Sequence, residues 1–187
     1  NNGYNVTQFY SLSLAPESGS NIMMGGAQDN GTLYGSSAGS SSWNSVESGD
    51  GTIVEVAPIA DDKIYTAYQL GGLRRRNRAG AFSADITPTA ARNQLFVNPI
   101  VLDPNNSSVM YYPGGKSTST TTTSAIWRTT SVKTITASTW TSLTSTDIGA
   151  ASGYSHYISA LGISTANNAN VLYYGTSDGV VYKLTSA

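Results

Sequence analysis

The chain has 187 residues, a formal net charge of −1 at pH 7 and only 11% charged residues. A chain of this length can bury a hydrophobic core, and its near-neutral charge gives no electrostatic reason to expect nucleic acid or an anionic membrane as a partner. It contains no cysteine, which excludes disulfides, thiolate nucleophiles and cysteine-ligated zinc. We therefore expect no nucleic-acid partner and no membrane insertion. The abundance of Ser, Thr, Asn and Gly predicts a secreted or cell-surface protein.

Short runs of apolar, β-branched or aromatic residues, often alternating with polar ones, extend along the chain. Residues 9–14 (FYSLSL) and 180–184 (VVYKL) are examples, and both patterns predict strands. Between such runs lie the Gly-containing tight-turn sequences Asp29-Asn30-Gly31, Gly49-Asp50-Gly51, Gly71-Gly72 and Ser177-Asp178-Gly179. We therefore predict a series of short antiparallel strands.

The strands recur as an internal repeat, in which a Pro or polar turn and a Gly turn separate successive strands. The first copy comprises residues 12–16, 21–26 and 31–34, and it ends near Trp43. The later copies comprise residues 54–58, 63–67 and 71–74, then 100–104, 108–112 and 126–129, and finally 158–163, 170–175 and 179–184. The repeat is therefore present about four times, with the last copy shortened.

The spacing of the repeat predicts the fold class. Pro16, Pro58 and Pro104 are 42 and 46 residues apart, and a four-stranded propeller blade takes about 40 to 50 residues. We predict an all-β, partial β-propeller of four-stranded antiparallel blades in a single domain. The expected blades are residues 4–47, 48–98, 99–157 and, incomplete, 158–187.

The predicted blades are too few for a closed ring. Six to eight blades require roughly 270 residues or more, and an open ring leaves sheet faces exposed to water. We therefore expect the partners to be the remaining blades of the same polypeptide or further copies of the chain. A glycan or a surface protein is a further candidate.

Several motifs resemble one family of propellers. Residues 25–32 (GGAQDNGT), 48–51 (SGDG), 68–74 (YQLGGLR), 102–106 (LDPNN) and 173–182 (YYGTSDGVVY) are similar to segments of the secreted BNR/Asp-box repeat proteins, which are related to sortilin-type domains. Residues 36–43 keep the serine and tryptophan of the Asp box and lack its aspartate. The resemblance implies a propeller of an exported bacterial surface or matrix protein.

Two carboxylates are the candidate catalytic residues. Asp29 and Asp50 both lie in Gly-flanked loops of one expected blade. Glycoside hydrolysis uses two carboxyl groups roughly 5 to 9.5 Å apart, one as an acid and one as a base or nucleophile. The alternative is that both aspartates are turn residues that accept hydrogen bonds from nearby backbone amides.

The candidate ligand-binding residues are Arg74, Arg76 and Tyr68. The two arginines belong to the cluster Arg74-Arg75-Arg76-Asn77-Arg78, which suggests a site for an acidic glycan or a neighbouring subunit. Consecutive residues of a strand point to alternate faces, so we expect that this run cannot converge on one carboxylate. The alternative is a solvated or inter-blade hairpin.

The remaining candidates predict packing rather than chemistry. His156 is the only histidine and provides neither a two-histidine metal site nor a triad. No metal and no cofactor are expected. The tyrosines at equivalent repeat positions are Tyr65, Tyr111, Tyr112, Tyr173 and Tyr174, and we predict that they belong to the inter-blade core.

Two functional hypotheses follow. The first is a non-enzymatic secreted or cell-surface propeller protein with a binding or structural role, through a glycan, a protein or self-assembly. The alternative is a secreted glycoside hydrolase that uses paired carboxylates, with Asp29 as the first residue to test.

Overall fold

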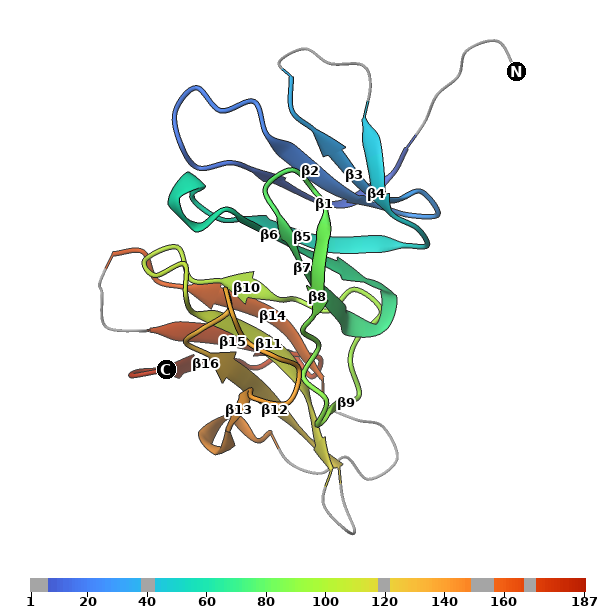
Figure 1. The fold of residues 1–187 in the computed structure, drawn as a ribbon. Helices are drawn as coiled ribbons and strands as arrows, with labels where there is room; N and C mark the ends of the chain where they lie inside the picture. Colours follow the sequence, from blue (N-terminus) through green and yellow to red (C-terminus); the bar gives the residue numbers. More distant parts are fainter. Residues whose placement is uncertain (1–6, 38–42, 118–121, 149–156, 167–170) are drawn as a thin grey trace. The chain divides into compact units, whose positions relative to one another are not determined.

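The chain is all-β, as predicted, and forms four small antiparallel sheets of propeller-blade type (Figure 1). The computed structural model describes residues 7–37, 43–117, 122–148, 157–166 and 171–187. His156 and the centre of the sequence resembling an Asp box, residues 38–42, lie outside the described residues. The fold class that the repeat predicts is therefore confirmed.

The first two sheets are four-stranded, and their strands follow one another in chain order. The first comprises β1 (Phe9–Leu14), β2 (Met23–Ala27), β3 (Gly31–Gly35) and β4 (Asn44–Glu47). The second comprises β5 (Gly51–Val56), β6 (Lys63–Tyr68), β7 (Gly72–Asn77) and β8 (Phe82–Asp85). Short 3-10 turns at Ile59–Asp61 (η1) and Gln69–Gly71 (η2) connect the strands of the second sheet.

The third and fourth sheets follow the same up-and-down order. The third comprises β10 (Val101–Leu102), β11 (Met110–Ser117), β12 (Thr122–Thr129) and β13 (Thr141–Leu143), which is followed by the 3-10 turn η3 (Thr144–Thr146). The fourth has three strands, β14 (Ile158–Ile163), β15 (Leu172–Thr176) and β16 (Val181–Leu184). The strand β9 (Ala91–Arg92) lies within the stretch expected for the second blade, and it pairs with β11 of the third sheet.

The four sheets belong to two compact units. Unit 1 is Asn1–Ala84 and contains the first two sheets except for Asp85, the last residue of β8; unit 2 is Asp85–Ala187 and contains the last two sheets. That the whole chain is a single domain stays a prediction. Each unit has its own core, described below.

The predicted tight turns have the backbone conformations that their residues favour. Asp29, in the turn between β2 and β3, and Gly31, the first residue of β3, have φ angles of 57° and 69°. Gly179, between β15 and β16, has a φ of 86°. Positive φ is accessible to glycine at no steric cost and to aspartate at a small one. These residues therefore direct the chain into hairpins where the sequence indicates them.

The core of unit 1 is formed by facing side chains of its two sheets. Met24 and Tyr34 from the first sheet and Val54, Val56 and Ile64 from the second are buried in one cluster. Residues of a strand that are two apart lie on the same face, and Val54 and Val56 of β5 show this spacing. The two sheets of unit 1 are thus packed face to face, as neighbouring blades are.

Serine hydroxyls join the two sheets of unit 1 where β1 passes β5. The Ser11 hydroxyl donates to the Thr52 carbonyl at 2.7 Å and accepts from the Val54 amide at 3.1 Å. The Ser13 hydroxyl accepts from the Val56 amide at 3.0 Å. Next to this contact, a Cβ on Gly26 would lie 2.0 Å from the Thr52 carbonyl oxygen. Only glycine permits this approach of the two backbones.

The core of unit 2 is an apolar and tyrosine cluster shared by its two sheets. It contains Val109, Tyr111, Ile126, Ile158, Leu172, Tyr174 and Ala187. Among the tyrosines predicted as core, Tyr65, Tyr111, Tyr112 and Tyr174 are buried. Tyr173 is 41% exposed, because it points to the opposite face of β15 from Tyr174. The prediction is wrong for this residue.

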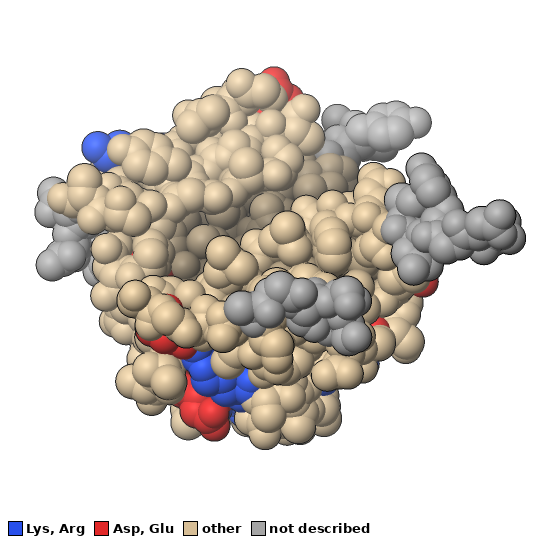
Figure 2. Space-filling view, turned by 90° about the horizontal axis from the view of Figure 1, so that it is seen from above, with Lys and Arg blue, Asp and Glu red and all other residues tan. Residues whose placement is uncertain are grey.

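Charge is sparse on the surface that Figure 2 displays. Most of that face is uncharged; Lys and Arg atoms near its lower edge lie beside Asp and Glu atoms, and a second small group of Lys or Arg atoms at the upper left stands alone. No helix among the described residues is long and apolar enough to cross a membrane.

Candidate ligand-binding surface

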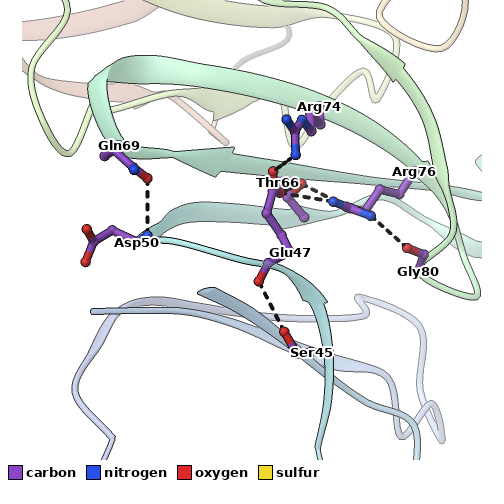
Figure 3. Close-up of polar contacts among 8 residues, drawn as sticks. All are labelled: Ser45, Glu47, Asp50, Thr66, Gln69, Arg74, Arg76 and Gly80. Atoms are coloured by element: carbon purple, nitrogen blue, oxygen red, sulfur yellow. Dashed lines mark hydrogen bonds and ion pairs between the residues drawn. The ribbon is translucent and has the colours of Figure 1, made fainter. Parts of the chain in front are cut away.

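Glu47, the last residue of β4, is the centre of a buried ion cluster in unit 1. Its side chain is only 1% exposed and pairs with Arg74 and Arg76 of β7. The Arg76 Nη2 atom lies 3.1 Å from Glu47 Oε2, and Arg74 Nη1 contacts Glu47 Oε1. Figure 3 shows the arginines and Thr66 converging on this carboxylate. Glu47 thus joins the edge of the first sheet to the second.

This convergence corrects the expectation that the arginine run cannot meet on one carboxylate. Successive residues of a strand do alternate between faces, so Arg75 points to the other side of β7 from its neighbours. Arg74 and Arg76 are two apart, however, and so share a face. The expected alternative of an inter-blade hairpin describes the run better, because the partner of both arginines lies on the neighbouring sheet.

The other polar atoms of the cluster are also satisfied. The Thr66 hydroxyl donates to Glu47 Oε2 at 3.0 Å and accepts from Arg76 Nε at 3.1 Å. Arg76 Nη1 donates to the Gly80 carbonyl at 3.1 Å. A buried carboxylate is tolerated only when it is paired and hydrogen-bonded in this way. The cluster therefore joins two blades, and its one carboxylate and two guanidinium groups leave a net positive charge on the Arg74 side, which reaches solvent.

Arg78, the residue after β7, continues the same pattern. It forms an ion pair with Glu17 and donates from Nη1 to the Ala57 carbonyl at 2.7 Å. Its own carbonyl accepts a hydrogen bond from the Tyr34 hydroxyl at 3.1 Å. Like Arg76, Arg78 is therefore committed to contacts within unit 1.

Arg74 is the member of the cluster that reaches solvent. Its side chain is 35% exposed, and its guanidinium carbon lies 4.7 Å from the ring centre of Tyr68 and 5.8 Å from that of Phe82. Phe82 is 59% exposed. The Tyr68 ring rests on Gly72, where a Cβ would be 1.9 Å from the ring. Tyr68, Arg74 and Phe82, here called the aromatic–arginine surface, group a partly exposed guanidinium with one half-buried and one exposed aromatic ring.

Asp29 and Asp50 meet in a hydrogen bond that holds two loops together. The Asp50 carboxylate accepts from the Asp29 amide at 2.8 Å. Gln69 clamps the Asp50 backbone, because its side-chain oxygen accepts from the Asp50 amide and its own amide donates to the Asp50 carbonyl, both at 3.2 Å. Figure 3 shows the Gln69 contact. For Asp50 this arrangement is the turn-residue alternative, in which a carboxylate accepts from a nearby backbone amide.

The geometry of unit 1 therefore joins its two sheets through ion pairs and places Arg74 beside two aromatic rings. Glu47, which sequence reasoning missed, is neutralised by two arginines. Two features of the sequence could have indicated it. Glu47 is an acidic residue at the end of the first expected blade, and Arg74 and Arg76 in the next blade are two residues apart, so they lie on one face of their strand. Among the described residues, no group of three or more His, Asp or Glu side chains is placed to hold a metal ion.

The chain matches no protein-family model and no curated protein.

Proposed function

We propose that this is a non-enzymatic, secreted or cell-surface propeller protein of the BNR/Asp-box type, whose unit 1 binds a protein partner through the aromatic–arginine surface. A second copy of the chain is the partner that we would test first.

One observation carries the proposal, namely that Arg74 is shared between a buried carboxylate and two aromatic rings, of which Tyr68 is half-buried and Phe82 exposed. Its pairing with Glu47 fixes the guanidinium plane, so little side-chain entropy remains to be lost on binding. Tyr, Phe and Arg are enriched where protein interfaces bury their centres. A near-neutral chain also has little self-repulsion to oppose association.

The hydrolase alternative has less support. A glycosidase needs one carboxyl group that gives a proton and one that accepts a proton or attacks. The Asp50 carboxylate instead accepts a hydrogen bond from the Asp29 backbone amide. Asp29→Asn and Asp50→Asn should therefore leave any polysaccharide-cleaving activity of the protein unchanged. Loss of a measured cleavage in Asp29→Asn, with the fold retained, would restore the alternative.

The experiment is sedimentation of the intact protein across a concentration series. Phe82→Ser and Tyr68→Ala should each shift the protein toward the monomer, by about tenfold or more in dissociation constant, since a hot-spot truncation costs roughly 2 kcal/mol or more. Tyr173→Ala is a matched control, because Tyr173 is also exposed and also lies beside a cation, the Lys183 ammonium at 6.0 Å. A monomeric wild type, or an equal effect of the control, would contradict the proposal.

A further inference from the structure

Unit 2 contains a pocket of about 420 Å³ beside β12 and β13. Small-molecule sites are typically about 300 to 1,000 Å³ in volume. Arg128, Thr141 and Leu143 come from the two strands, and the chain between them supplies the other wall. The lining residues are Arg128, Thr129, Thr130, Ser131, Thr134, Ile135, Thr136, Thr139, Thr141 and Leu143.

Hydroxyl groups dominate this lining, since all but three of its residues are serine or threonine. The Thr139 hydroxyl donates to the Thr136 carbonyl at 3.2 Å and lies 3.5 Å from the Thr136 hydroxyl. A hydroxyl has one donor and two acceptor positions, so each of these groups retains capacity for a ligand. Thr130, Thr136, Thr139 and Thr141 are exposed and therefore accessible. Such a wall is complementary to a polyhydroxylated molecule.

Arg128 is the one charged residue in this lining. The guanidinium carbon lies 6.0 Å from the ring centre of Tyr111. Unlike Arg74, Arg76 and Arg78, Arg128 has no carboxylate partner among the described residues. Its Nε atom is buried without a hydrogen-bond partner in that part of the chain, while its guanidinium group interacts with the Tyr111 hydroxyl. A guanidinium presents a planar fork of donors that fits a carboxylate, so the pocket has a place for a ligand's acid group.

We propose that this pocket binds the uronic acid residue of a glycan. The sugar carboxylate pairs with Arg128, the ring hydroxyls bond to the Ser and Thr side chains, and the apolar face of the sugar lies against Ile135 and Leu143. The lining contains neither an aromatic nor an acidic residue among those described. The stacking that anchors neutral sugars is therefore not supplied there, and no like charge in the lining opposes the carboxylate. This site is separate from the aromatic–arginine surface and does not depend on it.

The test is a titration of the isotope-labelled intact protein followed by amide resonances. Methyl galacturonoside is the probe, methyl galactoside tests the sugar without the acid, and acetate tests the acid without the sugar. We expect shifts confined to residues 128–143 and binding of the uronoside about tenfold or more tighter than of either control. Equal binding of methyl galactoside would overturn the role of the carboxylate. Equal binding of acetate would show a simple anion site and overturn the role of the sugar.

Two variants separate the site from the fold. Arg128→Lys keeps the charge but loses the planar fork, so uronoside binding should weaken about tenfold. Thr139→Val removes one exposed hydroxyl at similar volume and should weaken binding severalfold, with the amide spectrum otherwise unchanged. Thr165→Val, the same replacement at an exposed position of unit 2 outside the lining, is the control and should leave the affinity unchanged. Unchanged affinity in both pocket variants would overturn the proposal.

Discussion

The two units solve the same packing problem with different chemistry. In unit 1 the contact between sheets combines a small apolar cluster around Met24 and Ile64 with the buried Glu47 ion cluster. In unit 2 the buried cluster around Leu172 and Ile126 consists of apolar side chains and tyrosines. Each of these contacts, here called a joint, connects two neighbouring blades. The sequence repeat therefore determines the strands but does not determine which side chains form the joint.

The difference indicates what each joint contributes. An apolar contact is non-directional and stabilises roughly in proportion to the area that it buries. A buried ion cluster adds little net stability, because desolvation offsets much of the attraction, yet it is costly to break on one side. In unit 1 the directional ion pairs therefore specify how the two sheets are oriented, whereas in unit 2 the orientation depends on the shape complementarity of apolar side chains. We expect the two joints to respond differently to mutation, salt and pH.

The largest expected effect is at Glu47. Glu47→Ala leaves Arg74 and Arg76 without their carboxylate, and removal of one partner from a buried pair costs roughly 3–5 kcal/mol. Hydrogen exchange of the intact protein should show faster exchange in peptides of unit 1, with unit 2 little changed. Replacing Glu47, Arg74 and Arg76 together by Met and Leu is the matched control, and it should cost far less. Equal losses for both variants would mean that the charges do not fix the joint.

The next effect is at the centre of the apolar joint. Leu172→Ala removes a fully buried side chain of unit 2, at a cost of about 2–5 kcal/mol that depends on how far the cavity collapses. Exchange should increase in peptides of unit 2, and added salt should not change the difference from wild type. Val181→Ala, at an exposed position of β16, is the control. A strong salt dependence would contradict an apolar joint.

A smaller effect is expected from Ser13, which bonds β1 to β5 in unit 1. Ser13→Ala leaves the Val56 amide without its acceptor, and an unsatisfied buried donor costs about 1–3 kcal/mol. The loss should appear as faster exchange of the Val56 amide. Ser20→Ala is the comparison, since Ser20 bonds the amide of Ile22 only two residues away. An equal change in both variants would show that the inter-sheet bond has no special role.

The smallest expected effect is a loss of stability at alkaline pH, which should affect the joint of unit 2. Burial raises the pKa of Tyr111 and of Tyr174, both in the core of unit 2. A phenol whose folded pKa is raised contributes stability below its unfolded pKa of about 10, and this contribution is lost as pH rises through the folded value. Unit 2 should therefore lose stability above about pH 10. Tyr111→Phe should reduce that loss, which can be followed by phenolate absorbance and by hydrogen exchange of unit 2 as the pH is raised. An unchanged dependence of stability on pH would contradict the role of Tyr111.

The repeat predicted the four sheets, although not the pairing of β9, which lies in the stretch expected for the second blade and joins the third sheet. Residues 9–14 form β1, and the Gly-containing turns at Gly31 and Gly179 have positive φ as expected. These features are local, because alternation and turn chemistry act within a few residues. The spacing of the prolines then gave the length of a blade.

The joints were not predictable in the same way. Glu47 lies 27 residues from Arg74, and their contact depends on how two sheets pack. The hydroxyl-lined pocket also needs β12, β13 and the chain between them to be placed in space. Tyr173 and Tyr174 have the same residue type and adjacent positions, and only the pleat of β15 decides which is buried. These contacts and differences in burial depend on tertiary packing, which cannot be derived from the local pattern of a single sequence.

The serine contact between β1 and β5 also bears on the order in which the protein assembles as it is made. Ser11 and Ser13 each bond a residue 43 positions further along the chain, so both partners are present once Val56 has left the ribosome. Domains generally fold as units during synthesis, with the N-terminal part first. The contact between β1 and β5 can therefore form before unit 2 has been completed, and this joint does not wait for the rest of the chain.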